Sequence, residues 1–403
     1  MEKGLAFDQV GIIVEDENGK VLAFNEKKHL KPASLTKILT AGTALELLGT
    51  DFQFKSQLLM DGSIQNHTLK GSIYIRNDGD PTFNSRVLAN FLSALKNQKI
   101  QTIDGDIVID DSKQFDVQSP DTKSWQHTPN PGNFPLFVNV DPPAKVQPGS
   151  RAWNSAKKRL RRLIALNEDY VVYQNMVQPD LWTGQDFWLL LRKSKIRVTG
   201  HVIRGNVPEG VSEIAVVNTP LTLVIHNMLK SSNNFYADML IRNFAAHADS
   251  RPVTMEAGIK FLDSFLERVG VSHEDYSLYS GSGFTHNGFI TAGALCVVLN
   301  HLRAQPNVST VFYDSLPVAG LDGTLKHRMR RTEAVGRIHA KTGYLASLVS
   351  RTKRADGVVA LAGFANTSAE RSLTFVFLYN GRLSPYLVRS IFDKMCVILV
   401  TES

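Results

Sequence analysis

The sequence contains little cysteine and no long apolar run. Two of its 403 residues are cysteines, Cys296 and Cys396, and both lie in apolar segments with helical spacing. They match no metal-ligand spacing, so we expect buried free thiols; a disulfide between them is the less favoured interpretation. No stretch approaches 18 consecutive apolar residues, which argues against a transmembrane helix.

The N-terminal segment MEKGLAFDQVG lacks the apolar stretch of a secretory signal peptide. This absence leaves two interpretations. Either the protein is cytosolic, or the chain is a mature form to which a start methionine has been added.

Positive charge exceeds negative charge. The formal net charge is +7 with a pI of about 9.2, and basic runs occur at KKRLRRL (157–163) and KHRMRR (326–331). Such a balance suits an anionic partner, for example nucleic acid, a membrane surface or an anionic polymer, although a solvated helix face explains the runs more simply. No zinc-finger spacing or RNA-binding signature occurs, so we expect no nucleic-acid partner.

The composition, with 43% hydrophobic and 21% charged residues, is that of a globular protein of two or three domains. Near the N-terminus, VGIIVE and VLAFN flank an Asn-Gly turn and predict a hairpin. A helix is expected from about Pro32 to Gly49. Near the C-terminus, GRIHAKTG, YLASLVSRTKR and VVALAGFAN predict two or three strands.

A last helix is expected over 385–400. The apolar residues that recur in it at helical spacing are Leu387, Ile391, Met395 and Ile398. We interpret this stripe as a core face rather than a membrane anchor.

The middle of the chain differs from both ends. Residues 71–112 read as strand, turn, helix and strand, a proline-rich stretch occupies 120–148, and the pattern becomes helical from about Thr219. We therefore predict an α+β fold. One domain, with an antiparallel sheet flanked by helices, is expected from residues 1–61 and 218–403, and a mixed α/β unit is inserted at 62–217.

The segment PASLTK places Ser34 three residues before Lys37 at a predicted helix start. Ser-x-x-Lys also occurs at 93/96, 155/158 and 350/353, so the spacing alone decides nothing. Only the first copy follows a proline that begins a helix. Residues i and i+3 share a helix face, and the first-turn N–H groups are unpaired and carry partial positive charge. A nucleophilic serine there would have both a base and an oxyanion donor.

Two further segments follow in order. KSSNNFYAD holds two overlapping Ser-x-Asn matches, Ser231/Asn233 and Ser232/Asn234, and HAKTGYL holds Lys-Thr-Gly on a predicted strand. Each motif alone is more often structural than functional. The three motifs in this order, on these elements, are typical of the serine acyltransferases that react with penicillin.

With these motifs, the sequence resembles the D-alanyl-D-alanine carboxypeptidase/endopeptidase family, the low-molecular-mass class C penicillin-binding proteins with large inserted domains. The resemblance covers nearly the whole chain and includes PASLTKILTAGTALELLG, NDGDPTFNS, GDIVIDDSKQFD, KSSNNFYAD, GSGFTHNGFIT, LPVAGLDGTL and HAKTGYL. It implies a penicilloyl-serine-transferase fold, like that of β-lactamases and transpeptidases. KSSNNFYAD matches the family pattern Lys-x-Ser-Asp-Asn-x-x-Ala-Asp, which selects Ser232 and Asn234 as the pair.

The resemblance implies four catalytic residues. Ser34 attacks the substrate carbonyl and Lys37 accepts its proton. Ser232 relays a proton to the leaving amine, and Asn234 positions Lys37 and the substrate amide. Neither a metal nor a cofactor is implied.

The resemblance also implies a substrate-binding strand. Lys341 and Thr342, followed by Gly343, bind the terminal carboxylate of the substrate. The backbone N–H groups of Ser34 and Tyr344 stabilise the oxyanion.

The implied substrates are peptidoglycan peptides ending in D-Ala-D-Ala, and β-lactam antibiotics are the implied inhibitors. The implied location is periplasmic or otherwise extracytoplasmic, which requires that a signal peptide has been removed from this chain. The balance of carboxypeptidase and endopeptidase activity, the role of the insert and a peripheral contact with a membrane or an anionic wall polymer stay open.

Three positions depart from the family pattern. Asn233 and Ser280 stand where Asp is usual, and Tyr344 stands where Thr is common. None of them removes a reacting group, but a bulky ring at 344 would narrow the cleft.

Two rival functions are a β-lactamase and a wall-binding protein with a dead site. Class A β-lactamases use a Glu to activate the deacylating water, and no Glu-x-x-x-Asn segment lies between Ser232 and Lys341. All three motifs are retained, which argues against a dead site.

Overall fold

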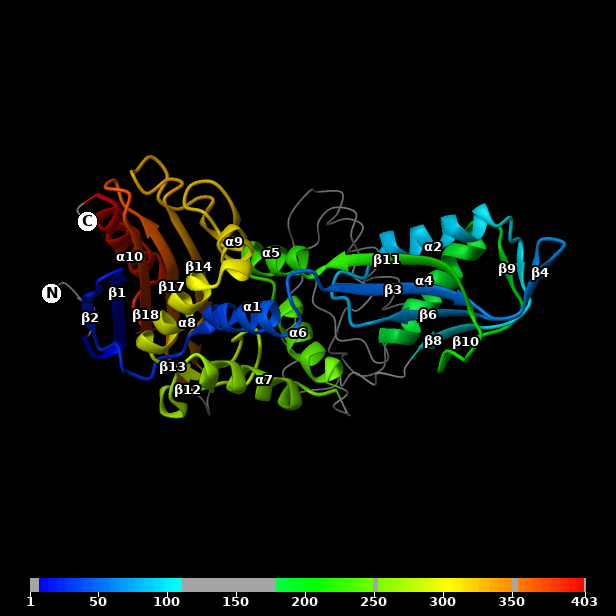
Figure 1. Ribbon diagram of the computed structural model, residues 1–403, viewed down its shortest axis with the longest axis horizontal. Helices are drawn as coiled ribbons and strands as arrows, with labels where there is room; N and C mark the ends of the chain where they lie inside the picture. Colours follow the sequence, from blue (N-terminus) through cyan, green and yellow to red (C-terminus); the bar gives the residue numbers. More distant parts are fainter. Residues whose placement is uncertain (1–6, 111–178, 249–252, 350–353, 402–403) are drawn as a thin grey trace. The chain divides into compact units, whose positions relative to one another are not determined.

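The computed structural model describes residues 7–110, 179–248, 253–349 and 354–401, which form two compact units (Figure 1). Unit 1 comprises Met1–Phe52, Leu221–Ala248 and Met255–Ser403, and unit 2 comprises Gln53–Pro220 and Asp249–Thr254. Unit 2 therefore begins at residue 53 rather than 62 and ends at 220 rather than 217, because its first and last long strands pair with each other. The division into a catalytic domain and an inserted domain stays a prediction.

Both ends of the chain build the antiparallel sheet of unit 1. Its strands, in spatial order, are β14 (Ile338–Leu345), β17 (Gly357–Asn366), β18 (Ser372–Gly381), β1 (Val10–Asp16) and β2 (Gly19–Phe24). β1 pairs with β18 in the register Val10↔Tyr379, so the predicted N-terminal hairpin and C-terminal strands meet in one sheet. The predicted α+β class is confirmed for this unit.

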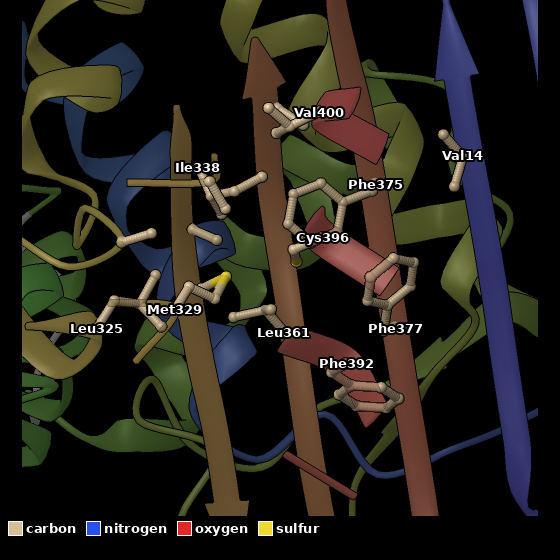
Figure 2. Close-up of a cluster of buried hydrophobic side chains, with 14 of the residues drawn as sticks. Val14, Leu325, Met329, Ile338, Leu361, Phe375, Phe377, Phe392, Cys396 and Val400 are labelled. Atoms are coloured by element: carbon tan, nitrogen blue, oxygen red, sulfur yellow. The ribbon is translucent and has the colours of Figure 1, made fainter. Parts of the chain in front are cut away.

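Helix α10 (Pro385–Thr401) packs on one face of this sheet, where its side chains join a core cluster with Phe375 and Phe377 of β18 (Figure 2). Its buried positions are Val388, Phe392, Cys396 and Val400. The predicted core stripe is therefore only partly right: Ile391 and Met395 pack against the edge of the cluster, but Leu387 and Ile398 are about half exposed. Both sets have helical spacing, so periodicity alone cannot identify the buried one.

Helix α8 (Ala292–Ala304) packs on the opposite face, against β1 and β18 (Figure 1). Thr374 of β18 alternates with the α10-facing phenylalanines, and its hydroxyl donates to Asn300 Oδ1 of α8 at 2.6 Å. Cys296 on α8 and Cys396 on α10 are buried free thiols, as predicted.

The remaining helices of unit 1 in the described chain are α1 (Thr36–Leu47), α5 (Leu221–Ser231), α6 (Asn234–His247), α7 (Met255–Arg268) and α9 (Pro306–Ser315). Its short elements are η1 (Phe7–Gln9), η2 (Ala33–Leu35), η4 (His273–Asp275), η5 (Gly323–Leu325), β12 (Tyr276–Ser277), β13 (Phe289–Ile290), β15 (Leu348–Val349) and β16 (Arg354–Ala355). This region is mostly helical from α5 to α9, as predicted.

Unit 2 is built on two sheets. The larger has the order β10 (Val202–Gly205), β8 (Ile107–Asp110), β6 (Ile73–Asn77), β3 (Gln53–Met60) and β11 (Ser212–Pro220); the smaller has the order β4 (Ser63–Gln65), β5 (Thr68–Lys70), β7 (Thr102–Ile103) and β9 (Arg197–Val198). Helices α2 (Ser85–Asn97) and α4 (Pro179–Lys193) bury apolar side chains, among them Phe91 and Phe187, in its core. β6, α2 and β8 confirm the predicted strand, turn, helix and strand as far as residue 110.

The remaining predictions concern the proline-rich stretch, the two basic runs and a membrane-spanning helix. The proline-rich stretch and the basic run at 157–163 lie outside the described residues. The basic run at 326–331 follows η5 as turns, so its interpretation as a helix face is wrong. Among the residues that the structure describes, no helix has the length and apolar character needed to cross a membrane.

The α10 core gives a test of the fold. Phe392→Ala removes a side chain that is 1% exposed and should lower the free energy of unfolding by about 3–5 kcal/mol. Leu387→Ala, on the same helix at 46% exposure, is the control and should cost less than about 1 kcal/mol. Denaturant unfolding measures both; equal losses would contradict the packing described for α10.

Candidate active site

Ser34 lies in the 3-10 turn η2, which runs directly into α1. Pro32 precedes this turn, and Ala33 has a φ of 49°, which is uncommon for a residue with a side chain. The Thr36 hydroxyl donates to the Ala33 carbonyl oxygen at 3.0 Å and so supports the turn. The structure therefore places Ser34 at the start of the helix, about one turn before Lys37.

Lys37 is fully buried, and three segments of the chain supply partners for its amine. Its Nζ lies 2.9 Å from Ser34 Oγ, 2.7 Å from Asn234 Oδ1 and 2.9 Å from the Ser282 carbonyl oxygen. The oxygens of Asn234 and Ser282 only accept hydrogen bonds, so a neutral amine gives them both of its N–H groups. Its lone pair then faces the Ser34 hydroxyl, which is the geometry of a base for that proton.

The surroundings of Lys37 favour the neutral amine. Burial lowers the pKa of Lys37 to about 7, although the Asp238 carboxylate nearby acts in the opposite direction. Burial also lowers the pKa of Lys341 well below its usual value, and the charge of Lys37 adds to this effect. The site therefore holds two amines that can lose their protons far more readily than a lysine in water.

Ser232 and Asn234 lie at the start of α6. Ser232 has a φ of 57°, and Asn234 is the first residue of the helix. The Asn233 side chain caps α6 by accepting a backbone N–H bond of its first turn; Asn and Asp cap equally well, so this departure from the family pattern keeps the cap. The Ser231 hydroxyl instead donates to Asn227 O within α5 at 2.6 Å, so only the second Ser-x-Asn match points its serine toward the site.

Lys341 lies on β14 and is fully buried. Its Nζ donates to Ser232 Oγ at 2.8 Å and to the Thr342 carbonyl oxygen at 2.8 Å. The Thr342 hydroxyl contacts Thr324 Oγ1 of η5 at 2.8 Å. β14 is an edge strand of the sheet, and residues 317–319 pair with part of its outer edge, where the Ala340 N–H donates to the Pro317 carbonyl oxygen at 2.9 Å.

The two residues after Thr342 have different roles in packing. A Cβ at Gly343 would lie 2.8 Å from the Pro32 carbonyl oxygen, so glycine lets β14 approach the turn before Ser34. Tyr344 lies three positions from Lys341, on the opposite face of the strand. Tyr344 shares its face with Thr342, and its ring lies 4.9 Å from the guanidinium carbon of Arg389 on α10. That this ring narrows the cleft stays a prediction.

Two residues beside Lys37 were not predicted as site residues. Ser282 offers its carbonyl oxygen to Lys37, and its N–H donates to Asp238 Oδ1 at 2.9 Å. Both lie in segments quoted for the family resemblance, GSGFTHNGFIT and KSSNNFYAD, but a backbone carbonyl leaves no signal in a sequence. Gly283, at φ 69°, follows; a Cβ there would lie 1.9 Å from the Ala33 carbonyl oxygen.

The other Ser-x-x-Lys copies do not build this arrangement where they are described. Ser93 lies on α2 in unit 2 and donates its hydroxyl to Ala89 O at 2.9 Å, an ordinary helix contact. The copies at 155/158 and 350/353 lie outside the described residues. Within the described chain, no group of three or more His, Cys, Asp or Glu side chains is arranged to hold a metal ion.

Comparison with known proteins extends these observations. The sequence profile of the D-Ala-D-Ala carboxypeptidase 3 (S13) family matches residues 2–134 and 165–401. The D-alanyl-D-alanine carboxypeptidase DacB of Haemophilus influenzae is 26% identical over 92% of this chain and 85% of its own length. The crystal structure of penicillin binding protein 4 (dacB) from the same species has a TM-score of 0.73 at 23% identity and covers 96% of each chain.

A more distant structural neighbour is a predatory peptidoglycan endopeptidase from Bdellovibrio bacteriovorus. It has a TM-score of 0.62 at 16% identity and covers 98% of this chain and 93% of its own. The same endopeptidase has been solved acylated by penicillin G. These likenesses confirm the predicted penicilloyl-serine-transferase type of fold.

The geometry at Lys37 predicts a pH dependence. With the pKa of Lys37 near 7, the neutral base forms as pH rises through 7, so the rate of penicillin acylation should rise to a plateau above pH 8. At pH 5 only about 1% of the amine would be neutral, which makes acylation about 100-fold slower. Lys37→Arg should be nearly inactive at every pH, because guanidinium stays protonated. Single-turnover labelling from pH 5 to pH 10 measures this; a flat profile, or an active arginine variant, would mean that the base lies elsewhere.

Proposed function

Because the chain belongs to the D-Ala-D-Ala carboxypeptidase 3 (S13) family, and is therefore a serine-type D-Ala-D-Ala carboxypeptidase, we propose that it works through an acyl-enzyme on Ser34. The observation that carries this proposal is the 2.9 Å contact between Ser34 Oγ and the buried amine of Lys37. A serine hydroxyl is a weak nucleophile until a neighbouring base takes its proton, and this amine is placed to do so.

In the proposed acylation, Ser34 Oγ attacks the carbonyl carbon of the scissile amide while Lys37 takes the hydroxyl proton. Collapse of the tetrahedral intermediate breaks the C–N bond, and Ser232 relays to the leaving amine the proton that Lys37 took, which leaves Lys37 neutral again. Asn234 holds the Lys37 amine and the substrate amide. Water then attacks the ester, releases the shortened peptide and restores the Ser34 hydroxyl.

Recognition of the substrate is assigned to β14 and the start of α1. Lys341 and Thr342 bind the carboxylate at the end of the peptide, next to Gly343, which keeps the strand close to Ser34. The backbone N–H groups of Ser34 and Tyr344 donate to the oxyanion. These donors need no side chain, so tyrosine at 344 preserves this function.

We place the substrate among peptidoglycan peptides that end in D-Ala-D-Ala. Endopeptidase cleavage of related cross-links belongs to the same proposal, supported by the similar fold of the Bdellovibrio peptidoglycan endopeptidase. β-Lactams acylate the same serine. Such a substrate requires an extracytoplasmic location, where the net charge of +7 would favour a peripheral contact with an anionic wall polymer or membrane surface.

The first test concerns the nucleophile. Ser34→Ala should abolish covalent labelling by fluorescent penicillin and lower the free energy of unfolding by only about 1 kcal/mol, the cost of one lost hydrogen bond. Ser93→Ala, which changes the Ser-x-x-Lys copy on α2, is the matched control and should label like the wild type.

Mass spectrometry of the adduct identifies the labelled residue. A stable adduct on Ser34 supports the proposal, rapid turnover of the label would indicate a β-lactamase, and absence of label would indicate a wall-binding protein with a dead site. An adduct on another serine would contradict the assignment of Ser34.

The second test concerns Lys341. If this amine binds the terminal carboxylate, Lys341→Ala should slow hydrolysis of peptides with a free C-terminus about 10- to 150-fold more than that of amidated peptides. This range corresponds to a charge-assisted hydrogen bond of about 1.5–3 kcal/mol. kcat/KM for the paired substrates measures it, and equal losses on both would mean that Lys341 only supports Ser232.

A further inference from the structure

A buried pair of opposite charges lies behind the Lys37 amine, on α6. Asp238 and Arg242 are one helical turn apart and are 2% and 0% exposed. The Arg242 guanidinium donates through Nη1 to the backbone carbonyl oxygen of Asp238 at 3.1 Å. The mechanism proposed above uses neither side chain, and burial of two charged groups costs free energy unless they compensate each other.

Asp238 is connected to Lys37 through the Ser282 peptide. Its carboxylate accepts the Ser282 N–H, and the Ser282 carbonyl oxygen accepts a hydrogen bond from Lys37 Nζ. The negative charge of Asp238 also attracts a proton to the Lys37 amine and so raises the pKa of Lys37. A carboxylate without compensation would therefore hold Lys37 in its protonated form, which cannot act as a base.

Arg242 supplies the compensating charge. Burial raises the pKa of Asp238 to about 6, and the Arg242 guanidinium, which stays protonated at any pH of interest, opposes this effect and favours the carboxylate. Its positive charge cancels part of the field of Asp238 at Lys37. Removal of Arg242 would leave Lys37 as the nearest cation for Asp238.

The other charged groups around Lys37 do not replace Arg242. Lys341 on β14 carries no fixed charge, because burial lowers its own pKa well below the usual value. Glu46 lies nine residues along α1, about 13 Å away, where Arg268 and His301 pair with it. The faces that α5 and α7 bury consist of apolar residues and glycine.

We propose that Arg242 is a positioning residue for acylation: its buried guanidinium, bonded to the Asp238 carbonyl oxygen, balances the charge of the Asp238 carboxylate, so that Asp238 orients the Ser282 peptide without keeping a proton on Lys37. This inference rests on the proposed function of Lys37 as the base. It assigns to α6 a pair of side chains that never touch the substrate but determine the pH at which Ser34 reacts.

Two single substitutions should move the pH profile of penicillin acylation in opposite directions. Arg242→Met leaves Asp238 uncompensated, so the midpoint should rise by about one pH unit and acylation at pH 6 should slow about tenfold. Asp238→Asn removes the carboxylate but keeps an oxygen for the Ser282 N–H, so the midpoint should fall by about one unit. The double variant loses both charges and should return toward the wild-type midpoint.

One control separates the local effect of Arg242 from the loss of any partly buried ion pair. Arg328→Met breaks a different partly buried ion pair of unit 1, in which Arg328 Nη2 lies 2.6 Å from Asp393 Oδ1, and it should leave the midpoint unchanged. Thermal unfolding identifies variants that do not fold. If Arg242→Met is one of them, the direction in which Asp238→Asn moves the midpoint of the pH profile tests the inference.

The outcomes are distinguishable. Midpoints that move in opposite directions for Arg242→Met and Asp238→Asn support the inference. Folded, labelled variants whose midpoints stay fixed or move together would overturn the role of Arg242 alone. A wild-type chain that takes no label on Ser34 would contradict the proposed function, and this role of Arg242 with it.

Discussion

The contact between the Lys37 amine and the Ser34 hydroxyl requires a lysine to be buried, and several segments of unit 1 supply the polar groups that this burial needs. A buried amine is costly unless polar groups surround it, and here they come from η2, α6 and the loop that contains Ser282. Because three segments of the chain reach the Lys37 nitrogen, their backbones lie close to one another. The positive φ angles of Ala33 and Ser232 are part of that cost, which is about 1–2 kcal/mol for each residue.

The site contains two buried amines, and each faces a hydroxyl: Lys37 faces Ser34, and Lys341 faces Ser232. Two protonated amines would repel each other, so burial and this repulsion favour the loss of a proton from one of them. In the proposed mechanism, the substrate carboxylate stabilises the charge of Lys341 and leaves Lys37 neutral. Substrate binding and activation of the nucleophile are then linked by electrostatics alone.

The sequence predicted the parts of the site that depend on local structure. Pro32 before Ser34, the two serines before α6 and the Lys-Thr-Gly strand all appear where the local signals place them. Sequence could not predict Ser282, because a peptide carbonyl has no side-chain signature, nor the pairing of Asp238 with that peptide, which exists only in the folded chain. It also misplaced the centre of the buried face of α10, since contacts with the sheet determine that face.

The sheet of unit 1 has a consequence for the order in which the protein becomes competent during synthesis. Ser34 and Lys37 leave the ribosome early, but β1 pairs with β18, and Lys341 enters the sheet by pairing β14 with β17. Unit 2, which lies mostly in one stretch between them, has its own core and is complete much sooner. Ser34 and Lys37 therefore lack their partners in the proposed site until the last strands are made, and an incompletely synthesised chain cannot present that site.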